Sequence, residues 1–105
     1  MSEQLPDIIE QVQQDDQEQT EEPPLFRVLL HNDDYTPKDL VVEILVVLFH
    51  KERAAAMELM WRIHKGAAGV AGVYPHEIAE TKVLAVTTVA RESGFPLKAT
   101  MEPDV

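Results

Sequence analysis

A short polar stretch between two mostly apolar segments carries the side chains that are most able to do chemistry. The sequence HNDDYTP at 31–37 follows the apolar run at 25–30 and contributes one amide and two carboxylates, from Asn32, Asp33 and Asp34. Their oxygens accept hydrogen bonds, so they suit an ammonium group, which offers three donors and one positive charge. Clustered carboxylates also suit magnesium, and Asn and Asp are common in simple turns because their side chains bond nearby backbone amides. The spacing alone leaves these interpretations open and favours the simple turn.

A second group of side chains lies further along the chain, in a segment that is predicted to be helical. Met60, Ile63 and His64 stand at i, i+3 and i+4, so two apolar side chains and an imidazole share one patch of the helix surface. Polar acceptors beside an apolar surface suit a ligand that has a charged head and a hydrophobic body. The N-terminal residue of a protein has this form when its side chain is large and apolar.

Catalytic patterns are absent from the sequence. The HEIAE sequence at 76–80 lacks the second histidine of the zinc-protease HExxH motif, and there is no glycine-rich phosphate loop. The chain has no cysteine, and Ser2 and Ser93 are its only serines, neither of them placed like an activated nucleophile. The other three histidines have no partner at a metal-binding spacing; they are His31, His50 and His76. We therefore expect a binding protein without catalytic residues, cofactor or metal, and keep a small metal-dependent enzyme as a distant alternative.

Charge and length divide the chain into a tail and one domain. Residues 1–24 hold eight acidic side chains and no basic one, whereas 25–105 hold eleven acids and nine bases. The acidic segment has no aromatic residue, so we expect a disordered extension followed by a single domain. Within the tail, four apolar residues have helical spacing and could form a short helix on a partner, although scattered apolar residues are an equally simple interpretation; they are Leu5, Ile8, Ile9 and Val12.

The same features indicate where the protein acts. The N-terminal residues lack the pattern of a secretion signal or transit peptide. The longest apolar run, at 40–49, is far shorter than the roughly 20 residues that span a bilayer. No stripe of Lys and Arg with interleaved aromatics is present. We therefore expect a soluble, cytoplasmic, monomeric protein with no membrane or nucleic-acid partner.

The first half of the domain is predicted to contain one strand and two helices. Residues 26–31 are rich in large apolar side chains, as is typical of a buried strand. Thr36 stands where an N-cap belongs and Pro37 where a first helical residue belongs, so we expect a largely buried helix that includes 40–49. A second helix is predicted at 52–65, with Gly66 as its stop.

The second half is predicted to contain two strands and one helix. Residues 69–74 fit a strand, and Pro75 opens a helix that ends at Gly94. The apolar residues that we expect to face inward from this helix are Ile78, Val83, Val86 and Val89. Alternation at 97–102 predicts a half-buried strand. The order β-α-α-β-α-β predicts an α+β fold, with a three-stranded antiparallel sheet and three helices on one side.

Four motifs in this order closely resemble the ClpS adaptors of the bacterial N-degron pathway. They are NDDYTP at 32–37, MWRIH at 60–64, GVAGVY at 69–74 and HEIAETKV at 76–83, and the likeness covers 25–102. The resemblance implies a non-enzymatic adaptor, which binds proteins that begin with a free Leu, Phe, Tyr or Trp. Such an adaptor delivers them to the N-terminal domain of the AAA+ unfoldase ClpA, or of a ClpC-type relative, for degradation by ClpP, and its N-terminal extension acts in that delivery.

The resemblance also implies roles for individual residues. The positions that take the substrate's α-amino group match Asn32, Asp33 and His64. The walls of the side-chain pocket match Thr36, Val41, Met60, Ile63 and Leu97. The surface that docks on the unfoldase matches Glu77 and Lys82, and Tyr35 is expected near it. The remaining alternative is a generic protein-interaction domain of the same fold that has a different partner.

Lys38 departs from the family pattern. Family members commonly carry Met at this pocket position, where it helps to exclude β-branched first residues. A lysine can pack its aliphatic stem, but its ammonium must reach water or an acid. We therefore expect weaker discrimination against Ile and Val, and modestly altered affinity for the usual ligands. An unchanged ratio of affinities for Ile-led and Leu-led peptides in Lys38→Met would contradict this expectation.

Overall fold

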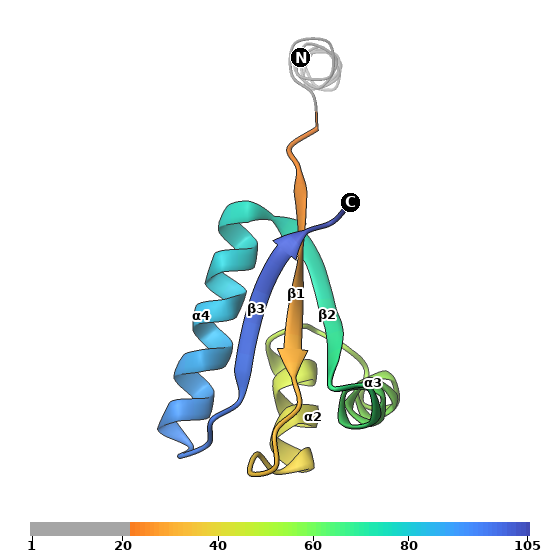
Figure 1. Ribbon diagram of the computed structural model, residues 1–105, viewed down its shortest axis with the longest axis vertical. Helices are drawn as coiled ribbons and strands as arrows, with labels where there is room; N and C mark the ends of the chain where they lie inside the picture. Colours follow the sequence, from red (N-terminus) through yellow and green to blue (C-terminus); the bar gives the residue numbers. More distant parts are fainter. Residues whose placement is uncertain (1–21) are drawn as a thin grey trace, which may run out of the picture.

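The computed structural model describes residues 22–105, so the expected extension and its four spaced apolar residues lie almost entirely outside the described residues. The elements are β1 (Leu25–His31), α2 (Lys38–Val47), α3 (Arg53–Gly66), β2 (Ala68–Pro75), α4 (His76–Glu92) and β3 (Lys98–Pro103). This order confirms the predicted β-α-α-β-α-β arrangement (Figure 1).

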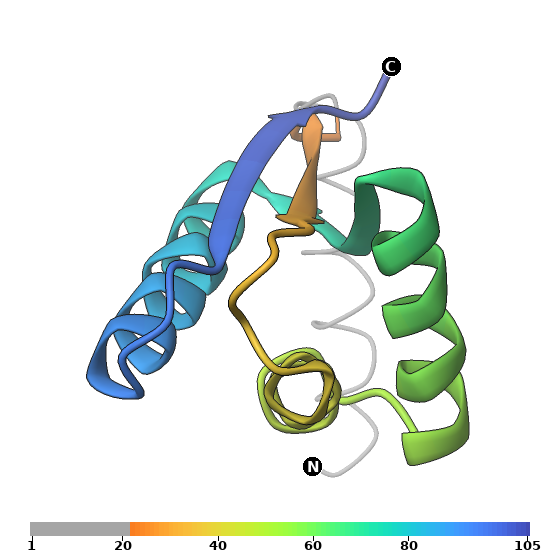
Figure 2. The same cartoon turned by 60° about the horizontal axis from the view of Figure 1, so that its bottom comes forward.

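The sheet has β1 at its centre, in the order β2-β1-β3, and both pairings are antiparallel. Leu25 pairs with Pro75 at one end of β1, and His31 pairs with Ala68 and Lys98 at the other end. All three helices lie on one face of the sheet (Figure 2), which confirms the predicted α+β fold. The sheet therefore has two distinct ends, one where α4 begins and one where the chain leaves β1 for α2.

Side-chain alternation in β1 explains why only one face is covered. Val28 and Leu30 are fully buried, because they point toward the helices. Arg27 lies on the other face, where its guanidinium is 3.1 Å from the carboxylate of Glu102 and 3.6 Å from that of Asp104. Polar pairs of this kind suit a face that remains in contact with water.

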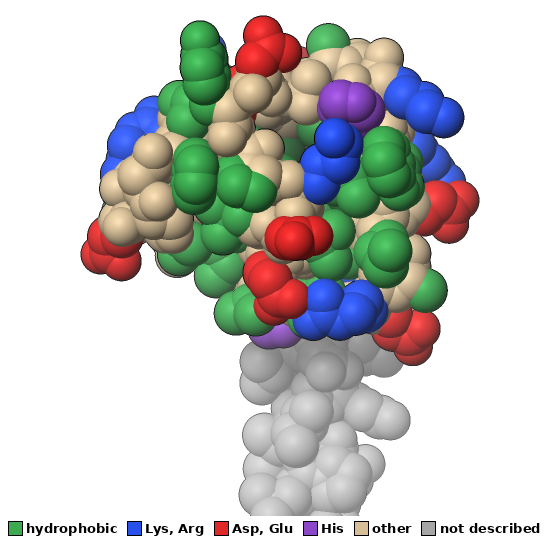
Figure 3. Space-filling view, turned by 90° about the horizontal axis from the view of Figure 1, so that it is seen from below, with side chains coloured by type: hydrophobic (Ala, Val, Ile, Leu, Met, Phe, Trp, Pro, Cys, Tyr) green, Lys and Arg blue, Asp and Glu red, His purple; other side chains and the backbone are tan. Residues whose placement is uncertain are grey.

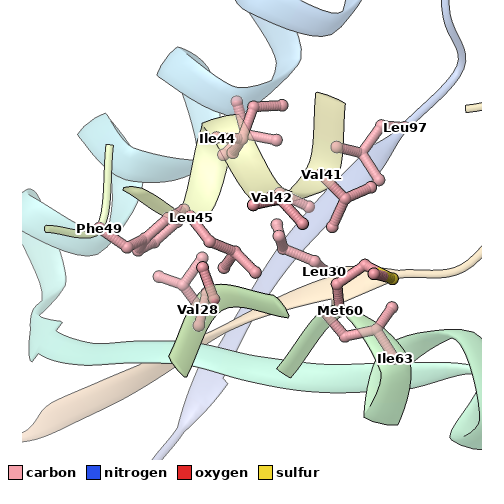
Figure 4. Close-up of a cluster of buried hydrophobic side chains, with 14 of the residues drawn as sticks. Val28, Leu30, Val41, Val42, Ile44, Leu45, Phe49, Met60, Ile63 and Leu97 are labelled. Atoms are coloured by element: carbon pink, nitrogen blue, oxygen red, sulfur yellow. The ribbon is translucent and has the colours of Figure 1, made fainter. Parts of the chain in front are cut away.

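The core fills the space between the sheet and the helices (Figure 4). Its fully buried large side chains come from four elements and from Leu97 just before β3; they are Val28, Leu30, Leu45, Ile63, Val86 and Leu97. Each such side chain stabilises the fold by roughly 1.5 to 3 kcal/mol through removal from water. The expectation for α4 is partly wrong, because Ile78 is 48% exposed while the small residues Ala79 and Ala90 are buried. Small side chains allow α4 to lie close to the sheet.

Two helix ends differ from the prediction. Thr36 is not the N-cap of α2: Pro37 is, in extended conformation with no side-chain cap, and the Thr36 hydroxyl instead donates to Asp33. Gly66 remains helical, and the left-handed residue after α3 is Ala67, with φ of 73°. Gly94, with φ of 85°, follows α4 as predicted.

Candidate functional site

A pocket of about 160 Å³ lies at the end of the sheet where β1 leads into α2. Figure 3 views the molecule from this end and shows a hollow among apolar side chains, with Lys or Arg, His and acidic side chains around it. The residues that line the pocket are His31, Asn32, Asp33, Asp34, Thr36, Lys38, Val41, Met60, Ile63, His64 and Leu97. All nine side chains that the sequence analysis assigned to the α-amino site and the side-chain pocket are thus brought together.

The apolar part of the pocket is a surface of the core. Val41, Met60, Ile63 and Leu97 are between 1% and 7% exposed, and they meet from α2, α3 and the segment before β3 (Figure 4). Because core side chains are held in place by close packing, this surface is preformed. A ligand that covers it removes the last exposed apolar atoms of these residues from water.

Asp33 organises the turn that forms the polar part of the pocket. Its Oδ1 accepts hydrogen bonds from the amides of Tyr35, at 2.8 Å, and Thr36, at 2.7 Å, and its Oδ2 accepts one from the Thr36 hydroxyl at 2.7 Å. Partial burial raises the pKa of the Asp33 carboxyl, but these hydrogen bonds outweigh it, so the pKa lies below its ordinary value. Asp33 is therefore an anion near neutral pH, and about one of its four acceptor positions remains for a ligand.

Three other polar side chains of the pocket have no hydrogen-bond or ion-pair partner in the described part of the chain. Within residues 22–105, the side chains of Asn32, Asp34 and His64 make no hydrogen bond or ion pair. The backbone of Asn32 is nevertheless fixed, because its amide donates to the carbonyl of Ala67 at 2.7 Å. The pocket thus presents positioned polar side chains whose hydrogen-bonding capacity is unused.

Trp61 connects two residues of the pocket rim and was missed as a functional residue by the sequence analysis. The His64 ring meets the Trp61 ring edge to face, with centroids 5.8 Å apart, and the Lys38 ammonium lies 5.5 Å from the Trp61 centroid. The ammonium of Lys38 therefore rests on an aromatic face, an arrangement that the sequence expectation of water or an acid did not include. The signal was available, since Trp61 precedes His64 by one helical turn and is the only tryptophan.

His31 is a second residue that was not assigned to the pocket from sequence. Its Nε2 lies 2.7 Å from the hydroxyl of Thr100 across the β1–β3 pairing. This hydrogen bond holds the imidazole at the base of the NDDYTP turn. Asp34, which the sequence analysis weighed only as a turn or metal residue, also lines the pocket and is exposed.

The residues expected to dock on an unfoldase come from two parts of the chain. Glu77 and Lys82 lie on α4, near the end of the sheet where Leu25 pairs with Pro75. Tyr35 follows the other end of β1 and is 76% exposed. Its place beside the other two residues in one docking surface stays a prediction.

Lys82 is held by contacts within the molecule. Its ammonium donates to the carbonyl of Leu48 at 2.5 Å, just after α2, and lies 5.8 Å and 5.6 Å from the ring centroids of Phe49 and Tyr74. Burial raises the pKa of the Tyr74 hydroxyl. Lys82 thus secures the end of α2, whereas the Glu77 side chain is exposed and makes no hydrogen bond or ion pair within the described chain.

Residues 22–105 contain neither a cluster of metal ligands nor a membrane-spanning helix. No three side chains of His, Cys, Asp or Glu converge there in a way that could hold a metal ion, so the magnesium interpretation of the turn gains no ligand set. None of the helices in this part of the chain is both long and apolar enough to cross a bilayer.

Comparison with known proteins gives one consistent relationship. The family model described as "ATP-dependent Clp protease adaptor protein ClpS" matches residues 21–100. The ATP-dependent Clp protease adapter protein ClpS of Desulfotalea psychrophila is 51% identical over 86 residues, which cover 82% of this chain and 84% of the relative. The protein of the same name from Oleidesulfovibrio alaskensis is 52% identical over 86 residues, covering 82% and 83%.

A solved structure extends this likeness to three dimensions. It is described as the structure of Agrobacterium tumefaciens ClpS2 bound to L-phenylalaninamide. Its TM-score with this chain is 0.76 at 38% sequence identity, and the match covers 78% of this chain and 99% of that one.

Proposed function

The chain belongs to the ClpS family of Clp protease adaptors, and on this premise we propose that it binds proteins bearing a free N-terminal Leu, Phe, Tyr or Trp. In this proposal the adaptor hands them to a ClpA- or ClpC-type AAA+ unfoldase, for degradation by ClpP. It carries out no chemistry itself. The observation that carries the proposal is a single pocket in which a buried apolar surface adjoins an anionic turn with unused acceptors.

The polar side of the pocket suits an α-amino group. Such a group has a pKa of about 7.7 to 8.0, so near neutral pH it is mostly an ammonium with three donors. Asp33 supplies the compensating charge, while the amide oxygen of Asn32 and the imidazole of His64 offer further hydrogen-bonding positions. A charged hydrogen bond of this kind is stronger than a neutral one. Acetylation of the amine removes the charge and leaves only one donor.

The apolar side of the pocket suits one large side chain. A volume of about 160 Å³ is below the roughly 300 to 1,000 Å³ of sites for drug-sized ligands. Transfer of a Leu or Phe side chain from water onto this surface contributes roughly 1.5 to 3 kcal/mol. L-phenylalaninamide, the ligand in the similar ClpS2 structure, has both required parts, an α-amino group and an aromatic side chain. Affinity in this chain then depends on both ends of the first residue.

Delivery to the unfoldase uses a different part of the chain. We place the docking surface on α4, where Glu77 offers an exposed carboxylate and Lys82 lies close to the exposed side chain of Ile78. Tyr35 belongs to the pocket end and would reach a partner only if that partner also covers the turn. Residues 1–24 are proposed to act in substrate transfer and not in peptide affinity, and the adaptor is proposed to act as a cytoplasmic monomer.

Fluorescence anisotropy with paired peptides tests the proposal. A Leu-led and a Phe-led peptide are each compared with their N-acetylated forms, using the wild type, Asp33→Asn and Asp34→Asn. We expect binding of the free amines, a loss of more than about tenfold on acetylation, and a similar loss in Asp33→Asn. Asp34→Asn removes the same charge without touching the internal hydrogen bonds of the turn, so its effect should be smaller.

Two outcomes would contradict the proposal. Equal binding of free and acetylated peptides would show that the α-amino group is not recognised, and would favour a generic interaction domain of the same fold. A folded protein that binds neither peptide would show that the pocket serves another ligand. Circular dichroism of each variant separates these outcomes from unfolding.

A further inference from the structure

The pocket mouth holds a cation that the binding of a first residue does not use. Lys38 lines the pocket, and its ammonium lies 5.5 Å from the Trp61 ring centroid. Within residues 22–105 no carboxylate lies within ion-pair distance of it. The α-amino group and the first side chain of a ligand call for acceptors and apolar surface, and an ammonium is neither.

We propose that Lys38, held against Trp61, is a specificity residue that favours substrates with an acidic side chain at their second position. This inference rests on the proposed function and extends it from the first residue of the substrate to the second. Trp61 is a positioning residue, because its ring lies beneath the Lys38 ammonium and makes a T-shaped contact with the His64 imidazole.

In the proposed function, the second residue of a substrate lies at this mouth. With the amino end held by Asn32, Asp33 and His64 and the first side chain against the buried Ile63 and Leu97, the peptide leaves toward solvent. The next Cα lies only about 3.8 Å from the first. A Glu or Asp side chain there is within reach of an ammonium that stands on the rim.

The acidic side chains around the pocket mouth oppose the proposed effect of Lys38 on the second residue. The ligand's own ammonium compensates Asp33, but Asp34 is exposed on the pocket lining and has no internal partner within the described chain. Without Lys38, the remaining charge near the second residue is negative and favours a basic side chain. Removal of Lys38 should therefore abolish or reverse the preference for an acidic second residue.

Trp61 also supplies the readout. It is the only tryptophan of the chain and is 45% exposed, so its intrinsic fluorescence reports on the pocket mouth. Unlabelled peptides whose sequences differ only at position two, as Leu-Glu, Leu-Gln and Leu-Lys, can then be titrated directly. Each peptide keeps a free amino group and an amidated C-terminus, so that the second side chain is the only varied charge.

In the wild type we expect Leu-Glu to bind most tightly and Leu-Lys least tightly. An exposed charge pair is worth up to about 1 kcal/mol. The affinity should therefore fall about two- to fivefold from Leu-Glu to Leu-Gln, and again from Leu-Gln to Leu-Lys. The differences should shrink between about 0.05 M and about 0.5 M salt because exposed charges are screened. Lys38→Met should bring the ratio of the Leu-Glu affinity to the Leu-Lys affinity to one or below.

The matched control is Lys65→Met, which removes the same charge one residue after His64 at an exposed position that does not line the pocket. It should preserve the order of the three peptides. If Lys38→Met and Lys65→Met changed the ratio of peptide affinities equally, the inference would be overturned. The preference would then come from the net charge of the surface and not from Lys38. Equal binding of all three peptides to the wild type would also overturn the inference, although the proposed function would then stand. Failure of Leu-Gln to bind at all would overturn both.

Discussion

The two ends of the sheet use their polar side chains in opposite ways. At the end where α4 begins, Lys82 satisfies the Leu48 carbonyl and His76 lies 2.9 Å from the Glu80 carboxylate. At the pocket end, Asp33 bonds Thr36 and His31 bonds Thr100, but the side chains of Asn32, Asp34 and His64 make no hydrogen bond or ion pair within residues 22–105. Polar groups that the fold has already satisfied add to stability, whereas positioned groups left unsatisfied are available to a ligand.

The same contrast applies to apolar residues, and it gives the largest expected effect. Ile63 is 2% exposed and lines the pocket, whereas Val86, on α4, is fully buried and does not line it. Ile63→Ala should lower the free energy of unfolding by about 2 to 4 kcal/mol, and Val86→Ala by about 1 to 3 kcal/mol. Urea unfolding monitored by circular dichroism measures both values.

Peptide binding separates the two variants. Ile63→Ala should weaken the binding of a Leu-led peptide by about tenfold, because the pocket loses methylene contacts that are each worth about 0.8 kcal/mol. Val86→Ala should leave affinity within about twofold, measured well below the unfolding temperature. If Val86→Ala weakened peptide binding as much as Ile63→Ala does, affinity would depend on global stability. The two residues would then not differ in their role in binding.

Asp33 bonds the turn and is proposed to bind the ligand's amino group, so its removal should affect both stability and binding. Asp33→Asn weakens three hydrogen bonds to the turn and should cost about 1 to 2 kcal/mol of stability, besides the loss of amine binding. Asp34→Asn should change stability by less than about 0.5 kcal/mol. Thermal unfolding of both variants at one pH gives the comparison.

The pH dependence of stability identifies the charged form of Asp33. Its pKa is lower in the folded protein than the ordinary value near 3.8, so its contribution is complete above that value. The contribution is lost as the pH falls through the lower, folded pKa. The stability gap between wild type and Asp33→Asn should therefore stay constant from about pH 7 to pH 5 and narrow below about pH 4. A gap that narrowed already at pH 6 would assign the effect to another group.

Lys82 and Glu77 sharpen the comparison at the other end of the sheet. Lys82→Met should lower stability by about 1 kcal/mol, because the Leu48 carbonyl loses its ammonium donor and two aromatic faces lose a cation. Glu77→Gln should leave stability within about 0.5 kcal/mol. Neither variant should change peptide affinity by more than about twofold.

The unfoldase distinguishes the roles of these two residues. With a purified ClpA-type N-terminal domain, the proposed docking surface predicts weaker binding for Glu77→Gln without any structural cost. Weaker binding for Lys82→Met would combine a docking and a structural effect, which the urea unfolding of the same variant separates. Unchanged binding in Glu77→Gln would remove this residue from the docking surface.

Patterns with a strong local cause were predictable from the sequence. The periodicities and the Pro and Gly positions placed every strand and helix within two residues of its observed bounds. The pocket residues followed from a polar turn, helical spacing and a family likeness. The structure brings these residues together because β1 ends and α2 begins at the turn, and α3 packs beside α2.

The errors arose where side chains had more than one possible partner. Thr36 could cap α2 or bond Asp33, and it bonds Asp33 because that carboxylate is already fixed by two backbone amides. Ile78 has the spacing of an inward residue, but Ala79 takes the buried position close to the sheet. Trp61 was given no role from the sequence, whereas its ring contacts both the Lys38 ammonium and the His64 imidazole at the pocket rim.

The end of α3 provides the smallest expected effect and a test of the packing there. Glycine was predicted to terminate the helix at position 66, yet Gly66 is helical and Ala67 has φ of 73°. An alanine in this region is strained by its Cβ, so Ala67→Gly should raise stability by about 0.5 to 1 kcal/mol, although glycine also loses more entropy on folding. Differential scanning calorimetry can resolve a change of this size.

Ala67 also touches the pocket, because its carbonyl accepts the hydrogen bond from the Asn32 amide. Its strain is therefore located at the contact that holds the binding turn against α3. If Ala67→Gly raises stability and leaves peptide affinity unchanged, the strain is a local cost of the short α3–β2 connection. If stability rises while peptide affinity falls, the strained conformation of Ala67 helps to position Asn32 for binding. The strain at this end of the sheet would then lower folding stability and favour recognition of the peptide.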